Sequence, residues 1–339
     1  MRRWAGWAFA GWWGACALAC TAPSGAEPVA VPTLPPVAAP VDEPIQPLPD
    51  RVEVDAAKAA LGGLLFDEKW LAKDGSMSCA TCHPLSRAAA DGLVRSPAVG
   101  GGLTGANTPT LFNVGFNFRF SWSGQQRTLE EQVEAALKRS MGQGADAAAA
   151  TLAQDPRWQA RFKDVFGEPP TGAGVRAALA EFQRTLVTPN APLDRWLRGD
   201  ATALTAEQQE GYALFKDLGC ASCHQGRNVG GNMFQRMGVM VDYFSARGGP
   251  PLASDQGRYQ ETRQEEDRHV FRVPSLRNVE RTAPYLHDGT ATTLEDAVHV
   301  MAAHQLGRTL TPQQVKLLVA FLRSLTAPDP VLAHAGGTP

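Results

Sequence analysis

Two short segments of the chain carry the same chemistry. Residues 79–83 read Cys-Ala-Thr-Cys-His, and residues 220–224 read Cys-Ala-Ser-Cys-His. This is the attachment signature of c-type haem, in which two thiols bond the porphyrin and the histidine lies beneath the iron. Two complete signatures argue against a disulfide or a zinc knuckle. The sequence therefore predicts two covalently bound haem c groups, held by Cys79, Cys82, His83, Cys220, Cys223 and His224.

The N-terminus has the pattern of an export signal. Arg2 and Arg3 precede an uncharged apolar run over 4–19, which ends in a small-residue cleavage site. The run is short for a membrane-spanning helix, which needs about 20 residues. We therefore predict a signal peptide over 1–19 and a periplasmic location. The next residue, Cys20, becomes a lipid anchor if "ALAC" is a lipobox. Because Ala17 stands where leucine is usual, lipidation and plain secretion both stay open.

Composition limits the remaining terminal segments and the partners. Residues 20–50 are rich in proline and have no periodic apolar pattern, which predicts an extended, poorly ordered tether. Residues 328–339 form a tail. The formal net charge of −2 argues against a nucleic-acid-binding protein, which would show a strongly basic face.

The chain repeats itself around the two signatures. "TPTLFNV" (108–114) parallels "VPSLRNV" (273–279), and the match continues downstream without a gap. The separation between haem signature and repeated segment is longer in the second copy. We place its additional residues between 229 and 268. Two copies indicate a tandem duplication, since a solenoid needs at least three.

The helical spacing of apolar residues predicts a mainly α fold. The best examples are residues 129–140, 173–187 and 311–325, the last with Thr311 as N-cap and Pro312 at the first helical position. We expect a few short strands in the glycine-rich connections. The fold class is thus two tandem class I cytochrome c-like haem domains related by internal duplication. Their predicted bounds are 51–200 for the N-terminal, peroxidatic domain and 201–327 for the C-terminal, electron-transfer domain.

The aligned copies differ where a haem would meet its sixth ligand. Met301 aligns with Ala136, and Ala297 aligns with Gln132. A Met opposite His224 would close the second iron and raise its reduction potential, which suits electron transfer. Since alanine cannot ligate, the first iron would stay open to a small oxidant, with the amide of Gln132 beside it.

Other side chains compete with Met301 for the second iron. His304 lies further along roughly the same helical face, whereas His299 points elsewhere. Three further methionines stand in the inserted region, namely Met233, Met237 and Met240.

The sequence resembles the bacterial di-haem cytochrome c peroxidases and their relatives of the MauG type over about residues 55–327. The resemblance is carried by both haem signatures, "NTPTLFNV", "LEEQ", "GCASCHQGRNVGGNMF" and "FRVPSLRNVERTAPYLHDGTATTLEDAVHVMAAHQLGRTLT". In these peroxidases the Met of the last segment ligates the high-potential haem, and it matches Met301. MauG-type enzymes usually have Tyr there, so Met301 places the chain nearer the peroxidases.

The resemblance implies roles for five further residues. Trp122 matches the Trp between the haems that aids electron passage, and Gln132 matches the distal Gln of the peroxidatic haem. The remaining three match residues around an interdomain calcium ion, for which oxygen ligands are suitable. These three are Asn107, Thr282 and Pro284.

Two departures from the family pattern concern the first haem. The family places a Glu before a Met-Gly pair, where this chain has Ser140, and a hydroxyl cannot replace that acid/base. Arg139 could stabilise a departing hydroxide but could not accept a proton. Many members also hold a distal His on the resting peroxidatic haem. Residues 95–105 contain no His, and Val99 stands near its place, which predicts an open first haem.

The leading hypothesis is an exported peroxidase that reduces hydrogen peroxide to water. Its electrons would come from a small periplasmic cytochrome c or cupredoxin. One alternative is a MauG-like oxidase that modifies a partner protein. Another is a non-enzymatic electron relay or haem sensor. Members of this family are often dimers, so a homodimer is a further expectation from the resemblance.

Overall fold

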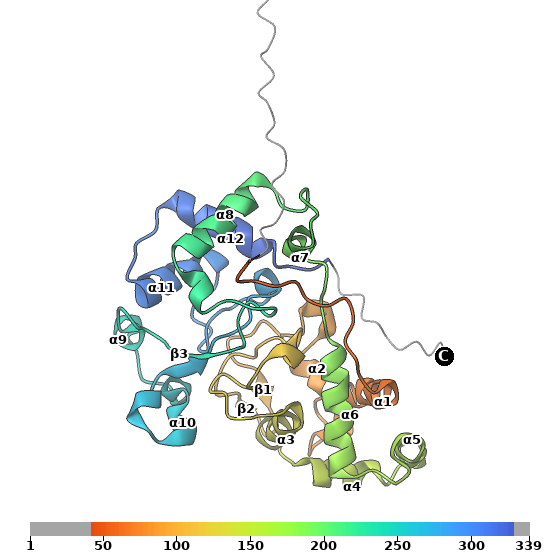
Figure 1. Cartoon of the computed structure of the whole chain (residues 1–339). Coiled ribbons are helices and arrows are strands. Elements are labelled where there is room, and N and C mark those ends of the chain that lie inside the picture. Colours follow the sequence, from red (N-terminus) through yellow and green to blue (C-terminus); the bar gives the residue numbers. More distant parts are fainter. Residues whose placement is uncertain (1–41, 329–339) are drawn as a thin grey trace, which may run out of the picture. The chain divides into compact units, whose positions relative to one another are not determined.

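Two pairs of crossing helices organise residues 42–328, the part of the chain that the computed structural model describes (Figure 1). In the first pair α1 (Ala56–Phe66) packs across α6 (Gly172–Thr185). In the second pair α8 (Ala206–Asp217) packs across α12 (Pro312–Arg323). The prediction of a mainly α fold built from two related haem-type domains is confirmed.

A glycine permits each close crossing. A Cβ atom on Gly62 would overlap the carbonyl oxygen of Ala178, and a Cβ atom on Gly211 would overlap that of Leu317. Gly62 opens the segment "GGLLF" (62–66), and Gly211 opens the similar segment "GYALF" (211–215), each upstream of a haem signature. The duplication therefore reproduces the same backbone-to-backbone contact twice, once between α1 and α6 and once between α8 and α12.

The remaining elements fill in around these pairs. The N-terminal domain adds α2 (Cys79–Cys82), β1 (Pro97–Ala98), β2 (Gly102–Leu103), α3 (Leu129–Ser140), α4 (Ala145–Leu152) and α5 (Pro156–Phe166). The C-terminal domain adds α7 (Pro192–Leu197), β3 (Phe234–Arg236), α9 (Tyr243–Arg247), α10 (Tyr259–Thr262), β4 (Val270–Arg272) and α11 (Leu294–Leu306). Each two-stranded sheet is an antiparallel pair, β1 with β2 and β3 with β4.

The predicted helices form close to their expected bounds because the sequence supplies their caps. Thr128 accepts a hydrogen bond from the first turn of α3, and Thr293 does the same at the equivalent start of α11. Thr311 caps α12, with Pro312 at its first position as predicted. The sequence pattern thus sets where the two equivalent helices α3 and α11 begin.

The additional residues of the second copy build α9 and α10. These two helices lie between β3 and β4. The corresponding part of the N-terminal domain, residues 88–107, contains no helix. The placement of the surplus between residues 229 and 268 therefore agrees with the structure.

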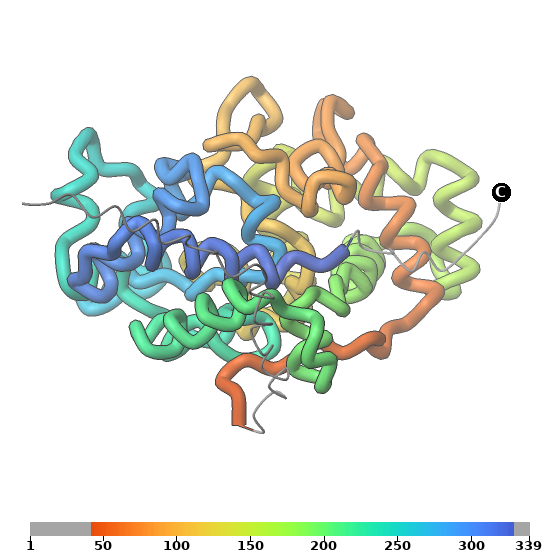
Figure 2. Tube along the Cα trace, turned by 90° about the horizontal axis from the view of Figure 1, so that it is seen from above, coloured from red at the N-terminus to blue at the C-terminus, as the bar shows by residue number. Residues whose placement is uncertain are grey.

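The end of the predicted tether is not loose. Ile45 and Leu48 are fully buried, and Ile45 packs in the core of the C-terminal domain. Gly226 exchanges backbone hydrogen bonds with this segment, and Glu43 pairs with Lys216 at 3.1 Å. In Figure 2 this segment, drawn in red, runs along green α8 before the chain reaches α1. Residues 43–48 therefore belong to the C-terminal domain, because two apolar side chains among the prolines have a core to enter.

Helix α7, which precedes the domain boundary predicted at residue 200, packs against the C-terminal core. Leu193 and Trp196 of α7 pack in the C-terminal core, where Trp196 meets Tyr212 edge-on. Asp194 forms a fully buried ion pair with Arg277 at 2.7 Å. Helix α7 thus contacts the second domain, and the boundary at residue 200 stays a prediction.

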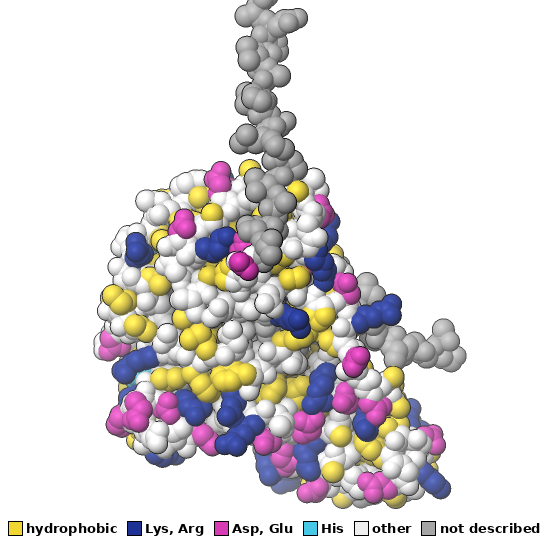
Figure 3. Space-filling model, viewed as in Figure 1, with side chains coloured by type: hydrophobic (Ala, Val, Ile, Leu, Met, Phe, Trp, Pro, Cys, Tyr) yellow, Lys and Arg dark blue, Asp and Glu magenta, His cyan; other side chains and the backbone are white. Residues whose placement is uncertain are grey.

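The surface and termini add three observations. On the face shown in Figure 3, basic and acidic side chains lie interspersed. No helix among residues 42–328 is long and apolar enough to cross a membrane. The predicted signal peptide, Cys20 and the tail from residue 329 lie outside the described residues.

We predict that Gly62→Ala destabilises the protein. The new methyl group must push α1 away from the backbone of α6, and such overpacking costs about 1–3 kcal/mol. The free energy of unfolding of the haem-loaded protein measures this loss. Gly63→Ala is the matched control, because a Cβ there meets only the Phe182 ring at 3.4 Å. Equal stabilities of the two variants would contradict the crossing argument.

Candidate haem sites

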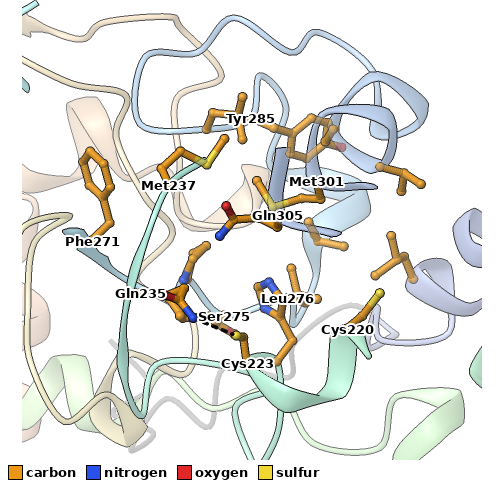
Figure 4. A pocket seen from close by; sticks show the side chains of 18 of the residues that line it. Cys220, Cys223, Gln235, Met237, Phe271, Ser275, Leu276, Tyr285, Met301 and Gln305 are labelled. Carbon is orange, nitrogen blue, oxygen red and sulfur yellow. Dashed lines mark hydrogen bonds between the residues drawn. The ribbon is translucent and has the colours of Figure 1, made fainter. Parts of the chain in front are cut away.

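A cavity of about 350 Å³ opens beside the second signature. Its wall includes Cys220, Cys223 and His224, and Met301 of α11 also lines it. Figure 4 shows Met301 and Met237 on the side of the cavity opposite the two cysteines. The volume lies in the range of cofactor pockets, about 300–1,000 Å³. The residue types and their placement therefore fit a haem attached at one edge and facing α11.

The attachment residues are in the chemical forms that haem binding needs. The described cysteines are free thiols, and burial raises the pKa of Cys220 to about 11. Burial also lowers the pKa of His224 to about 4, so its ring is neutral at pH 7 and can ligate iron. Thiols for two thioether bonds and one neutral imidazole are thus present at the second site.

The first signature has an equivalent arrangement. Burial raises the pKa of Cys79 to about 12 and lowers the pKa of His83. The Nδ1 atom of His83 lies 2.9 Å from the carbonyl oxygen of Ala89. As a donor to this carbonyl, Nδ1 fixes the ring orientation and leaves Nε2 for a metal. The first signature therefore also fits haem attachment.

The repeat relates the cavity-lining residues of α11 to residues of α3. Ala297, Met301 and Gln305 all line the second cavity. Their counterparts in the aligned first copy are Gln132, Ala136 and Ser140. The Oε1 atom of Gln132 is buried and has no hydrogen-bond partner among the described residues. An unpartnered amide oxygen is costly, which indicates that Gln132 is arranged for a group that binds there.

The structure separates Met301 from most of its rivals. The Nδ1 atom of His304 lies 3.0 Å from the carbonyl oxygen of Val241, outside the cavity. Met240 is 61% exposed, and only Met237 accompanies Met301 among the described methionines that line the cavity.

Arg139 is not among the α3 residues whose counterparts line the second cavity. Its side chain is exposed, and its Nη1 atom donates to Oε1 of Gln125 at 3.0 Å. Its counterpart in α11, His304, does not line the second cavity. Arg139 thus takes a position whose counterpart lies outside the second cavity, whereas the counterpart of Ser140, Gln305, lines it.

Trp122 lies where the two domains meet. Its Nε1 atom donates to the carbonyl oxygen of Asn107 at 2.8 Å, and its own carbonyl accepts from the backbone N–H of Arg272 at 2.9 Å. The indole ring borders the second cavity and stands 6.4 Å from the ring of His287. A residue of the first domain thus forms part of the wall of the second haem site.

A buried ion-pair network holds His287, which the sequence analysis did not single out. His287 Nε2 lies 2.8 Å from Asp255, and Arg247 bonds Asp255 and Asp288 at 2.7 and 2.8 Å. Burial opposes the charge of Asp255, yet the hydrogen bonds from Arg247 and His287 hold the pKa of this carboxyl well below its usual range. Arg247 thus ties both acids into one buried network around His287.

The predicted calcium residues lie together in the wall of the second cavity. Asn107, Thr282 and Pro284 all border it. The Nδ2 atom of Asn107 donates to the carbonyl oxygen of Leu93 at 2.8 Å, and its own carbonyl accepts from Trp122. Calcium at this place stays a prediction.

The segment expected to lack a distal His forms a small hairpin. Strands β1 and β2 pair within residues 95–105, and the backbone N–H of Val99 donates to the carbonyl oxygen of Ser140 at 2.9 Å. Val99 therefore lies against the end of α3, and an open first haem stays a prediction.

Two cysteine–histidine segments in duplicated helical domains define a di-haem c-type cytochrome. Comparison with known proteins supports this class directly. The family model described as di-haem cytochrome c peroxidase matches residues 56–202, and the cytochrome c model matches residues 208–326.

Characterised relatives cover most of the chain. It is 40% identical to the cytochrome c551 peroxidase of Nitrosomonas europaea, over 85% of this chain and 86% of that protein. It is 41% identical to the cytochrome c peroxidase Ccp of Escherichia coli (strain K12), over 84% of this chain but only 61% of that longer protein. It is 34% identical to the methylamine utilization protein MauG of Methylorubrum extorquens, over 83% and 81% of the two chains. The chain belongs to the bacterial di-haem cytochrome c peroxidase family, whose members are oxidoreductases.

Solved structures share the fold. A MauG-like protein associated with microbial copper homeostasis superposes with a TM-score of 0.71 at 28% identity, over 85% of this chain and 95% of that one. The di-haem peroxidase BthA from Burkholderia thailandensis gives a TM-score of 0.69 at 21% identity, over 85% and 91% of the two chains.

Proposed function

We propose that this protein reduces hydrogen peroxide to water with electrons from a small periplasmic donor. The observation that carries the proposal is the difference between α3 and α11. A Met sulfur faces the second cavity, and the equivalent position at the first site is Ala136. Bound haems would supply one relay centre with two protein ligands and one iron with an open face.

Side chains of this protein orient the peroxide, stabilise the leaving hydroxide and connect the two domains for electron transfer. Gln132 orients peroxide through its unpartnered amide oxygen, and Arg139 favours the departing hydroxide. Trp122 bridges the electron path between the domains. Each turnover consumes one peroxide, two electrons and two protons and yields two waters, so the donor is oxidised twice.

The missing acid is not replaced by another carboxylate of α3. Glu134 pairs with Lys138 and Arg176 at 3.0 and 3.1 Å, and Glu130 pairs with Arg184 at 2.8 Å. Both acids are therefore held in ion pairs. The third acid of α3, Glu131, is exposed and accepts a hydrogen bond from the backbone N–H of Arg127 at 2.7 Å. We therefore propose that water carries protons to peroxide at the first site.

Several finer features complete the proposal. The donor is a monohaem cytochrome c or a cupredoxin, and the protein acts in the periplasm. Calcium binds at Asn107, Thr282 and Pro284, whose positions border the same cavity. Cys20 carries a lipid anchor, a feature that rests on the sequence pattern. The protein forms a homodimer, a feature that rests on the family resemblance.

Steady-state turnover tests the function. Haem-loaded protein should oxidise reduced cytochrome c in the presence of peroxide, and low-temperature EPR of the oxidised protein should show one high-spin and one low-spin haem. Turnover no faster than free haem, with both haems attached, would refute the proposal. An electron relay or sensor would in addition show no cyanide binding at either haem.

A MauG-like oxidase that modifies a partner protein is the second candidate. Ser140 favours it, because the acid that serves peroxide cleavage is absent, whereas Met301 opposes it. Mass spectrometry of a co-expressed partner protein after peroxide treatment separates the two, since only the oxidase leaves a stable mass change.

We predict that Met301→Leu removes the sixth ligand of the second haem. The low-spin EPR signal should convert to a high-spin signal, because leucine keeps the apolar volume but offers no donor atom. Met240→Leu is the control at an exposed methionine and should leave the spectrum unchanged. If Met237→Leu instead abolishes the low-spin signal, the ligand assignment is wrong.

We predict that Ser140→Glu raises peroxidase turnover. A carboxylate at this position would act as the general acid/base that the chain lacks, and such groups contribute about 10²–10⁴-fold. We expect at least about a tenfold rise in kcat, measured with saturating peroxide. Ser140→Gln has the same size without the acid. Equal rates of the two variants would show that this position does not serve proton transfer.

A further inference from the structure

One buried arginine of the C-terminal domain has no acidic partner. Arg272 is 4% exposed and lines the second cavity. Its Nε atom donates to the carbonyl oxygen of Ser121 at 3.1 Å, and Nη1 makes long contacts of 3.4 Å with Asn117 Oδ1 and the carbonyl oxygen of Val273. Among residues 42–328, Nη2 forms no hydrogen bond and no carboxylate pairs with the guanidinium.

Two other arginines of the C-terminal domain, one fully buried and one with a 13% exposed side chain, show what such a group normally requires. Arg277, which is 1% exposed, pairs with Asp194 at 2.7 Å. Arg247 pairs with both Asp255 and Asp288. Burial alone lowers the pKa of Arg272 to about 10, with no neighbouring acid to oppose the loss of hydration. A buried cation without a counter-charge is costly, so its partner should come from what fills the cavity.

We propose that Arg272 is the counter-ion of a propionate of the second haem. Haem carries two carboxylates, and a guanidinium with free N–H groups is suited to pair with a carboxylate. The pair would lie at the wall of the cavity that the two domains share. The proposal rests on haem attachment within the proposed function but not on peroxide reduction.

The same residue connects this charge pair to the path between the domains. The backbone N–H of Arg272 donates to the carbonyl oxygen of Trp122, and Nε donates to the preceding Ser121. One residue therefore contacts the second haem and holds the Trp122 segment of the first domain. Arg272 is a positioning residue for electron transfer as well as a cofactor-binding residue.

A reductive titration of the holoprotein tests the proposal. In Arg272→Gln the propionate loses its counter-charge, which favours the ferric haem. The reduction equilibrium of the second haem should shift toward the oxidised form by about tenfold, or about 59 mV for one electron. Arg272→Lys keeps the charge and should retain most of the wild-type potential. The low-spin EPR signal should persist, since Met301 and His224 are untouched.

Two further variants keep the test decisive. Asn117→Asp offers Arg272 a competing carboxylate and should shift the potential in the same direction, even if Arg272→Gln does not fold. Arg236→Gln removes an exposed arginine from the same strand pair and should change the potential little. If Arg272→Gln folds, an unchanged reduction potential of its second haem would overturn the proposal. If Arg272→Gln does not fold, an unchanged potential in Asn117→Asp would overturn it.

Discussion

Covalent attachment of each porphyrin to one short segment is the constraint on which the rest of the structure depends. Once one edge and one axial face are fixed by Cys-x-x-Cys-His, each domain must close over the other face with a helix. The glycine crossing of α1 with α6, and of α8 with α12, sets the frame in which α3 and α11 perform this closure. Because the frame is duplicated, the chemical difference between the sites is left to the few side chains that face each iron.

The domains meet through residues that the duplication itself relates. Asn113 and its counterpart Asn278 both donate to the hydroxyl of Thr188, at 2.8 and 2.9 Å. Trp122 and its counterpart His287 contact each other edge-on. A residue can touch its own duplicate only near the axis that relates the two copies. The interface therefore brings equivalent positions of the two copies together, with the Trp122–His287 ring contact among them.

The sequence predicted the elements that are repeated or periodic. It did not predict the packing of segments whose position depends on contacts with distant parts of the chain. Helices 129–140 and 311–325 followed from their apolar spacing and their caps. The proline-rich residues 43–48 were expected to be loose, because composition cannot show that Ile45 and Leu48 find a core. Helix α7 packs with the second domain rather than the first for the same reason, since its packing on Tyr212 is a tertiary contact.

The candidate site shows the same division. Met301 and Gln132 could be selected because the duplication supplies an internal comparison, and their counterparts differ in chemical type. Arg272 has no such signal: its counterpart is Asn107, and nothing in the sequence indicates that this arginine is buried. Only the structure shows that it is buried without an acid, while Arg277, a little later in the chain, has Asp194. Arg272 stands out because the described residues provide no acidic partner for its buried guanidinium. Burial and the lack of such a partner become visible only in the folded chain, so the sequence alone could not reveal them.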